Sequence, residues 1–200
     1  MLAMIHHRLE QISKFAVWVG GAALMLAAIM VTIDVTFRKA FALTMSGSDE
    51  YSGYVFAAST TWAYSYCLLH RATVRIDALY NMLPRKVTAI LDVIGLILLH
   101  YFMSVMTYYA MIAFLNSWDK NSVSITTLAT PQWIPQLFWV MGLCLFVVTV
   151  TFVTIYSVTA LLQRNWDLVA RIAGVPSISE VMEEETHGID VMEASASKED

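Results

Sequence analysis

The sequence predicts an all-α membrane protein with four transmembrane helices and a short interfacial amphipathic helix between the second and the third. The chain has 200 residues, of which 58% are hydrophobic and only 14% are charged. A soluble domain usually has about 45–50% apolar and about 25% charged residues. The apolar residues gather in four blocks, each close to the roughly 20 residues that a helix needs to cross a bilayer.

The four blocks differ in character. The first, 15–37, is interrupted only by an aspartate near its end. The second, 52–69, is rich in small and aromatic residues, and the third, 87–115, is long enough to tilt. The fourth, 135–162, opens with a proline, which suits the first turn of a helix because its missing N–H does little harm there.

The remaining segments complete the expected organisation. Residues 1–14 form a cytoplasmic N-terminus, 15–163 a four-helix membrane domain, 164–174 a cytoplasmic interfacial segment and 175–200 a tail. The tail carries eight acidic residues and one base, whereas the rest of the chain carries 11 bases and 8 acids, a net charge of +3. We therefore expect a disordered acidic tail, and no basic patch that would bind nucleic acid.

Basic residues predict the orientation, because they are in excess on the cytoplasmic side of membrane proteins. Eight lie near the termini and in the 70–87 loop, and three lie in the segments 38–51 and 116–134. Both termini and the 70–87 loop are therefore expected in the cytoplasm. The first group is Arg8, Lys14, Arg71, Arg75, Arg85, Lys86, Arg164 and Arg171; the second is Arg38, Lys39 and Lys120.

The 70–87 loop has a helical pattern of its own. Ile76, Leu79, Tyr80 and Leu83 recur at i, i+3, i+4 and i+7, which indicates one apolar face of a short helix in the interface. A hairpin loop that happens to be half apolar is the alternative.

Two carboxylates inside apolar blocks are candidate sites, because charges within a membrane are usually functional. Asp34 has Arg38 one turn later on the same face, so a local ion pair is expected; a cation or proton site is the alternative and lacks a second carboxylate. Asp92 is expected to pair with Lys86, Arg85 or Arg75, or to contact another subunit.

His70 and His100 raise the question of haem, which two histidines can hold between membrane helices. His70 ends the second block, whereas His100 lies about 20 Å deeper along the third. One haem cannot reach both, so we expect no cofactor, and expect His100 to face a partner helix or to bond a tyrosine or serine. The sequence also contains no catalytic set or metal pattern, and we expect that the chain is no enzyme.

Small residues are frequent in the first and second blocks, including Gly20, Gly21, Ala58 and Ser59. Small faces allow membrane helices to approach closely. These blocks are therefore expected to pack tightly within the chain or against a partner.

Four motifs follow one another along the chain. They are Val35-Thr36-Phe37-Arg38, Ser46-Gly47-Ser48-Asp49-Glu50, His70-Arg71-Ala72-Thr73-Val74-Arg75-Ile76-Asp77 followed by Leu83-Pro84, and Thr130-Pro131-Gln132-Trp133-Ile134-Pro135-Gln136 before Gly142. In this order they resemble the small permease subunit (DctQ-like) of TRAP transporters, the tripartite ATP-independent periplasmic transporters. The chain departs from the family pattern at Thr73, where the family usually has histidine, and it lacks a glycine near 63–66.

The resemblance implies a scaffold subunit in the bacterial inner membrane. Such a subunit supports a large permease subunit in sodium-coupled uptake of an organic acid or related solute and helps to dock a periplasmic solute-binding protein. A haem-binding or quinone-linked membrane anchor is the alternative. The candidate interface residues toward the large subunit or membrane lipids are Arg38, Arg71, Arg75, Asp77, Asp92 and His100, and the candidate docking residues are Asp49, Glu50, Trp118, Asp119 and Lys120.

Overall fold

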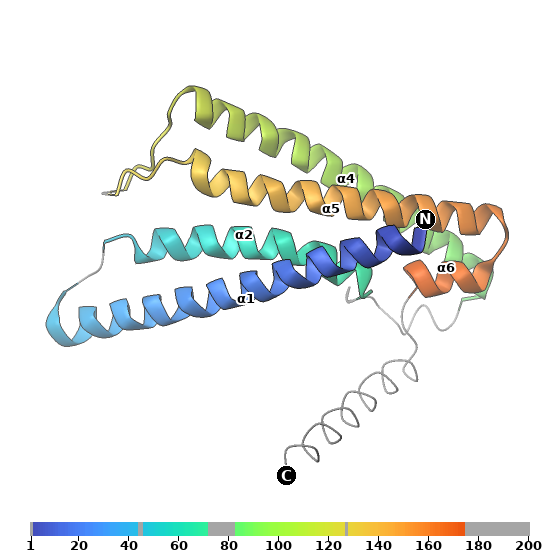
Figure 1. The fold of residues 1–200 in the computed structure, drawn as a ribbon, viewed down its shortest axis with the longest axis horizontal. Helices are drawn as coiled ribbons and strands as arrows, with labels where there is room; N and C mark the ends of the chain where they lie inside the picture. The colour runs from blue at the N-terminus through green and yellow to red at the C-terminus, as the bar shows by residue number, and fades with distance from the viewer. Residues whose placement is uncertain (1, 44–45, 72–82, 127, 175–200) are drawn as a thin grey trace, which may run out of the picture.

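The computed structural model describes residues 2–43, 46–71, 83–126 and 128–174, and this part of the chain is helical (Figure 1). An isolated antiparallel bridge between Val123 and Pro131 is the only β-type pairing among these residues. The described helices are α1 (Leu2–Phe41), α2 (Ser48–Leu69), α4 (Arg85–Asp119), α5 (Trp133–Leu162) and α6 (Trp166–Ala173). The all-α prediction is therefore confirmed.

The four long helices pack as a row. In Figure 1, α1 lies against α2, α2 against α5 and α5 against α4, so α1 and α4 form the two edges of the row. The short α6 packs on α4 and α5 at the end of the row where the chain begins. The order in space therefore differs from the order in sequence, because α5 is inserted between α2 and α4.

Three of the long helices are long and apolar enough to cross a membrane: Arg8–Phe41, Lys86–Asp119 and Trp133–Leu162. They correspond to the first, third and fourth predicted spans. The second predicted span, 52–69, lies within α2, which forms a helix but carries many serine, threonine and tyrosine residues between its apolar ones. Its crossing of the membrane stays a prediction.

The helices extend beyond the predicted apolar blocks. α1 begins at Leu2 rather than at residue 15, because its buried face continues: Leu9, Ser13 and Ala16, at i, i+4 and i+7, are all buried. α4 likewise runs past 87–115 at both ends. α5 begins at Trp133, so the proline of the fourth block stands in its first turn, as predicted.

α2 approaches both neighbours closely. A Cβ on Gly20 of α1 would lie 3.2 Å from the Cβ of Ser59, and the Ser59 hydroxyl donates a hydrogen bond of 3.1 Å to the Gly20 carbonyl. A Cβ on Gly142 of α5 would lie 2.4 Å from Oγ1 of Thr61. Nearby, the indole N–H of Trp62 donates a bond of 2.8 Å to the Phe138 carbonyl. The close packing predicted from small residues is thus present on both sides of α2.

The core lies between α4 and α5. Leu96, Met103 and Ala110 on α4 pack into one cluster with Leu143 and Val150 of α5, and all five are buried. Burial of apolar surface of this kind stabilises the pair by about 25 cal/mol per Å² in soluble proteins, whereas between membrane helices close van der Waals contact takes over that role.

A second cluster closes the end of the row that carries α6. It joins Ala89 and Val93 of α4, Ala160 of α5 and Val169 of α6, which is completely buried. The side-chain amide of Asn165 accepts a hydrogen bond of 3.2 Å from the Leu168 N–H and so caps the start of α6.

Two predicted features lie outside the described residues. The amphipathic helix expected around 76–83 falls almost entirely within 72–82, and the acidic tail is 175–200. Both stay predictions.

We predict that Gly142→Ala destabilises the protein by roughly 1–3 kcal/mol, because the added methyl group overpacks the contact with Thr61 and Trp62. Gly95→Ala on α4 is the matched control, since a Cβ there meets nothing within 4 Å and alanine is the better helix former. Thermal unfolding in mild detergent measures both. Equal midpoints for the two variants would contradict the close α2–α5 contact.

Candidate functional site

Two connecting segments meet at one end of the row. Residues 42–47 join α1 to α2 and residues 120–132 join α4 to α5, and both lie at the end opposite α6 and the N-terminus (Figure 1). We call this end, with the adjoining helix termini, the loop end. Two polar side-chain contacts there join elements that are distant in sequence, Asp34 with Ser48 and Glu50 with Thr126.

Asp34 is the buried polar centre of the loop end. Its side chain is completely buried, although it stands in an apolar stretch of α1. Arg38 Nη2 lies 2.5 Å from Oδ2 of Asp34, and the Ser48 hydroxyl donates a bond of 2.9 Å to the same oxygen. The predicted Asp34–Arg38 pair is confirmed, and it extends to the first residue of α2.

The Asp34 carboxylate stabilises the start of α2. The N-cap of α2 is Gly47, which offers no side chain to cap the helix. An acidic group near a helix N-terminus is favourable because the macrodipole is positive there. Asp34 of α1 bonds the first residue of α2 and adds to the charge of Asp49 and Glu50, which lie in the first turn of that helix.

Gly47 also joins the two connecting segments. Its φ of +99° lies in the left-handed region that favours glycine. A Cβ at this position would lie 1.9 Å from Cδ1 of Leu128. Leu128 of the α4–α5 segment therefore packs directly on the glycine backbone before α2.

Glu50 makes a second bridge between the two segments. Its Oε1 accepts a bond of 2.7 Å from the Tyr54 hydroxyl, and its Oε2 accepts one from the Thr126 hydroxyl. These two donors, Thr126 first and Tyr54 second, hold the pKa of Glu50 below its ordinary value of 4.5. Thr126 in turn lies 2.9 Å from the Ser124 hydroxyl.

The α4–α5 segment is ordered by its own backbone as well. The Ser124 N–H donates to the Thr130 carbonyl at 2.9 Å, and the Gln132 N–H donates to the Ser122 carbonyl at 3.0 Å. This short hairpin presents Ile125, whose side chain is fully exposed.

The other predicted docking residues lie at the same end of the row. Asp49 is exposed beside Glu50 at the start of α2, and Asp119 and Lys120 are exposed at the end of α4. Trp118 is half exposed and packs edge-on against Trp133, with 4.7 Å between ring centroids. Among the five candidate docking residues, Glu50 is tied by its described contacts to the segment between α4 and α5.

His70 and Arg71 lie at the opposite end of the row, where α2 ends. The His70 ring stacks on Tyr66 at 3.9 Å, its Nδ1 lies 3.1 Å from the Tyr66 carbonyl oxygen, and its Nε2 lies 3.9 Å from Glu10. Arg71 takes a left-handed φ of +52° that terminates the helix. Arg75 and Asp77 are outside the described residues.

Asp92 and His100 lie on α4. Asp92 is buried, at 4% exposure, and its pairing with Lys86, Arg85 or Arg75 stays a prediction. His100 turns toward α5, where its Nδ1 lies 3.4 Å from the Thr151 hydroxyl. It therefore faces α5 of the same chain, and the hydroxyl is that of a threonine rather than of the expected tyrosine or serine. Its place at an interface with the large subunit or lipid stays a prediction.

A groove of about 540 Å³ runs along α2 between α1 and α5. Its walls are apolar and aromatic, including Phe15, Val55 and Phe138, and no charged side chain lines it. In the described part of the chain, no three His, Cys, Asp or Glu residues gather in a way that could hold a metal ion.

Sequence reasoning missed the partners of the two carboxylates at the loop end. Ser48 and Thr126 are small hydroxyl residues in segments with no periodicity, and Thr126 is 76 residues from Glu50. The sequence signal for this contact region was Gly47, because a glycine before a helix start indicates either a left-handed backbone or a close contact. Gly47 has both a left-handed φ and a close contact with Leu128.

We predict that Asp34→Asn destabilises the loop end by about 1–3 kcal/mol, because buried hydrogen bonds to a charged group are lost and Arg38 is left unpaired. Amide hydrogen exchange in the first turn of α2 should accelerate. Asp49→Asn, which changes an exposed acid in the same turn, is the matched control and should leave that exchange nearly unchanged. If both substitutions behave alike, the buried pair has no special role.

We also predict that acid loosens the hairpin 120–132. Because the folded-state pKa of Glu50 is below 4.5, the bridge to Thr126 is fully present above that pH and is lost as the pH falls through the lowered pKa. The protection factor of the Ser124 amide, which is its exchange corrected for the intrinsic pH dependence, should fall there. Thr126→Val, which keeps the shape and removes the donor, should lower that protection factor already at pH 7. A pH response that persists in Glu50→Gln would assign it to another group.

A family model described as "Tripartite ATP-independent periplasmic transporters, DctQ component" matches residues 27–163 of the chain. The match covers more than half of the sequence, from the middle of α1 to the end of α5, and includes the whole loop end. No curated protein and no solved structure matched the chain.

Proposed function

Because the chain belongs to the DctQ component family of the tripartite ATP-independent periplasmic transporters, we propose that it is the scaffold of such a transporter. In this role it supports the large permease subunit in sodium-coupled uptake of an organic acid or related solute, and helps to dock the periplasmic solute-binding protein. The chain is a small membrane subunit of a TRAP transporter, and the family is one of transporter components rather than of enzymes.

The unbroken course of the long helices supports a scaffold over a solute carrier. Secondary transporters usually bind solute near the bilayer midplane on interrupted helices, whereas α1, α4 and α5 each run without a break. The Asp34 carboxylate, the charge that could have formed a cation site, is already engaged by Arg38 and Ser48. The groove along α2 has no charged lining to receive an organic anion.

We propose that α2 is the fourth transmembrane helix. Its predicted span, 52–69, covers about 27 Å at helical rise, which is close to the thickness of the hydrocarbon core, and it leaves Asp49 and Glu50 at the loop end. Its threonines lower the cost of entering lipid, because Thr60 donates to the Phe56 carbonyl at 2.6 Å and Thr61 to the Ala58 carbonyl at 2.9 Å. α2 also lies between α1 and α5, which shield its polar side chains from lipid.

The proposed orientation follows the basic residues. The termini and the 70–87 loop face the cytoplasm, and the loop end faces the periplasm across the inner membrane. Arg71, Arg75 and Asp77 would then meet anionic lipid headgroups or the large subunit on the cytoplasmic side, and Asp92 would contribute from α4.

The loop end would be the surface that meets the periplasmic binding protein. Asp49, Trp118, Asp119 and Lys120 are exposed there, on segments held together by Glu50 and by the contact of Gly47 with Leu128. A surface that is already ordered loses less conformational entropy when a partner binds. Arg38 stands beside this surface and is half exposed.

The test is purification of the tagged chain from its native membrane in mild detergent, with identification of each stoichiometric partner. We expect a large polytopic permease to co-purify and the sample to lack haem absorbance. Deletion of the chain should abolish sodium-dependent uptake of the solute bound by the periplasmic partner. A chain that purifies alone, or together with a redox subunit and bound haem, would contradict the proposed function and favour a membrane anchor.

A further inference from the structure

The outer edge of the row at α4 carries a regular stripe of large side chains, which we call the outward stripe. Successive members are separated by four, three, four, three and four residues, so they follow a heptad repeat. Each is exposed, with fractions between 37% for Ile112 and 70% for Tyr101. The outward stripe consists of Ile94, Leu98, Tyr101, Val105, Tyr108 and Ile112.

The opposite side of α4 carries a similar stripe, which is buried. Val93, Leu96, Met103 and Ala110 follow the same repeat, and each is at most 7% exposed. Leu96, Met103 and Ala110 lie in the cluster shared with α5. α4 thus carries two apolar stripes at helix-pairing spacing, and none of the described helices packs against the outward one.

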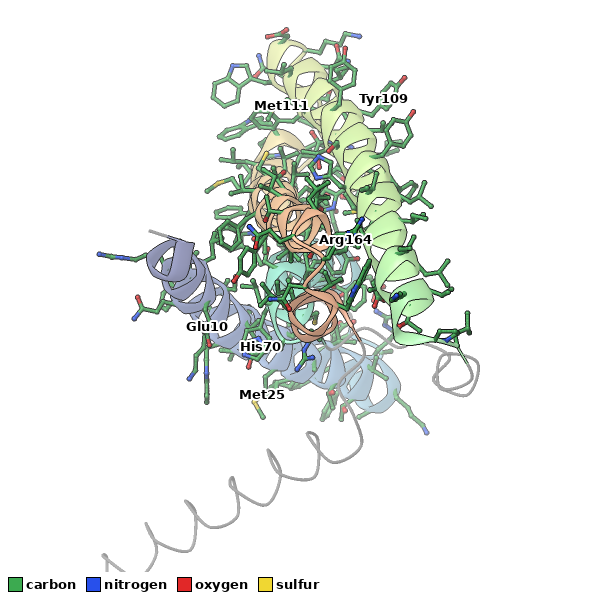
Figure 2. All side chains as sticks on the ribbon, turned by 90° about the vertical axis from the view of Figure 1, so that its right-hand side faces the viewer. Glu10, Met25, His70, Tyr109, Met111 and Arg164 are labelled. Atoms are coloured by element: carbon green, nitrogen blue, oxygen red, sulfur yellow. The ribbon has the colours of Figure 1, made fainter. Side chains whose placement is uncertain are left out.

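Tyrosine makes the outward stripe unlike an ordinary lipid-facing surface. Tyr101, Tyr108 and the adjacent Tyr109 are 64–70% exposed, and Tyr109 projects away from the rest of the chain (Figure 2). No hydrogen bond joins their hydroxyls to any other described residue. Tyr108 and Tyr109 contact each other only through their rings, at 5.5 Å.

These hydroxyls lie too deep for the membrane surface. Tyr101 is near the middle of the span Lys86–Asp119, and at helical rise Tyr108 is about 15 Å from Trp118 at the loop end. Tyrosine favours the membrane interface, where its hydroxyl is wet, whereas a hydroxyl without a partner in hydrocarbon is unfavourable. A partner must therefore supply hydrogen-bond acceptors at this depth.

The other edge of the row differs in this respect. α1 contains no tyrosine, and its exposed hydroxyls are satisfied within the helix: Thr32 donates to the Ala28 carbonyl and Thr36 to the Thr32 carbonyl, each at 2.7 Å. Its exposed Met25 and Leu26 are apolar. α1 is suited to lipid in a way that α4 is not.

We propose that the outward stripe of α4 is the docking surface for the large permease subunit, and that a transmembrane helix of that subunit packs along the heptad and accepts hydrogen bonds from Tyr101 and Tyr108. This inference rests on the proposed function, because the family match supplies the large subunit as the membrane partner. Two helices that pack along a heptad repeat cross in a left-handed sense at about +20°, which is a common angle between membrane helices.

The experiment places a photo-reactive p-benzoylphenylalanine at single positions of the full chain, expressed with its transporter partners in native membranes. Position Tyr108, which is 64% exposed, probes the outward stripe, and Met25 on α1, which is 70% exposed, is the matched control. Both edges are visible in Figure 2. A second measurement uses Tyr101→Phe with Tyr108→Phe, which removes two hydroxyls and keeps the rings. We expect this double variant to weaken recovery of the large subunit roughly three- to tenfold.

Cross-linking of the large subunit from position 108 and not from position 25, together with reduced recovery in the double variant, supports the proposal. Four outcomes would each overturn it: cross-linking from position 25 alone, equal yields from both positions, no adduct at either position, or an adduct at position 108 with a second copy of this chain. In those cases a large subunit that still co-purifies keeps the proposed function intact. If no large subunit co-purifies with the unmodified chain, the proposed function fails and this inference fails with it.

Discussion

The close approach of α2 to both of its neighbours is the constraint on which the row depends. Between membrane helices, apolar burial supplies little driving force because lipid is equally apolar, so backbones must come near each other. Gly20 allows this on the α1 side and Gly142 on the α5 side. A larger side chain at either glycine would separate the two halves of the row.

Polar contacts then fix the ends of helices that the glycines bring together. Asp34 links α1 to the start of α2, and Glu50 links that same start to the segment before α5. Both carboxylates act on the same helix end, whose own N-cap is a glycine. The loop end is therefore held by three unrelated segments, which gives it a defined shape without a covalent bond; the free thiols of Cys67 and Cys144 take no part.

A row of helices has two edges, and a membrane subunit with two edges can meet lipid on one side and protein on the other. Both edge helices expose large apolar side chains but differ in chemistry, since α1 satisfies its exposed threonine hydroxyls internally and α4 leaves three tyrosines facing outward. Spanning helices without interruptions suit a part that stays fixed while another subunit moves. The architecture therefore agrees with the scaffold role that we propose for this small membrane subunit.

The sequence by itself determined the helical class, the three apolar spans and the Asp34–Arg38 pair, because these depend on composition and on spacing within one helix. The resemblance of four motifs also identified the family. The tertiary structure alone decided the insertion of α5 between α2 and α4, the hydrogen bond between Thr126 and Glu50, and the packing of Leu128 on Gly47. Those contacts join residues far apart in the chain. The spacing of apolar residues along one helix indicates its buried face but not which other helix packs against that face.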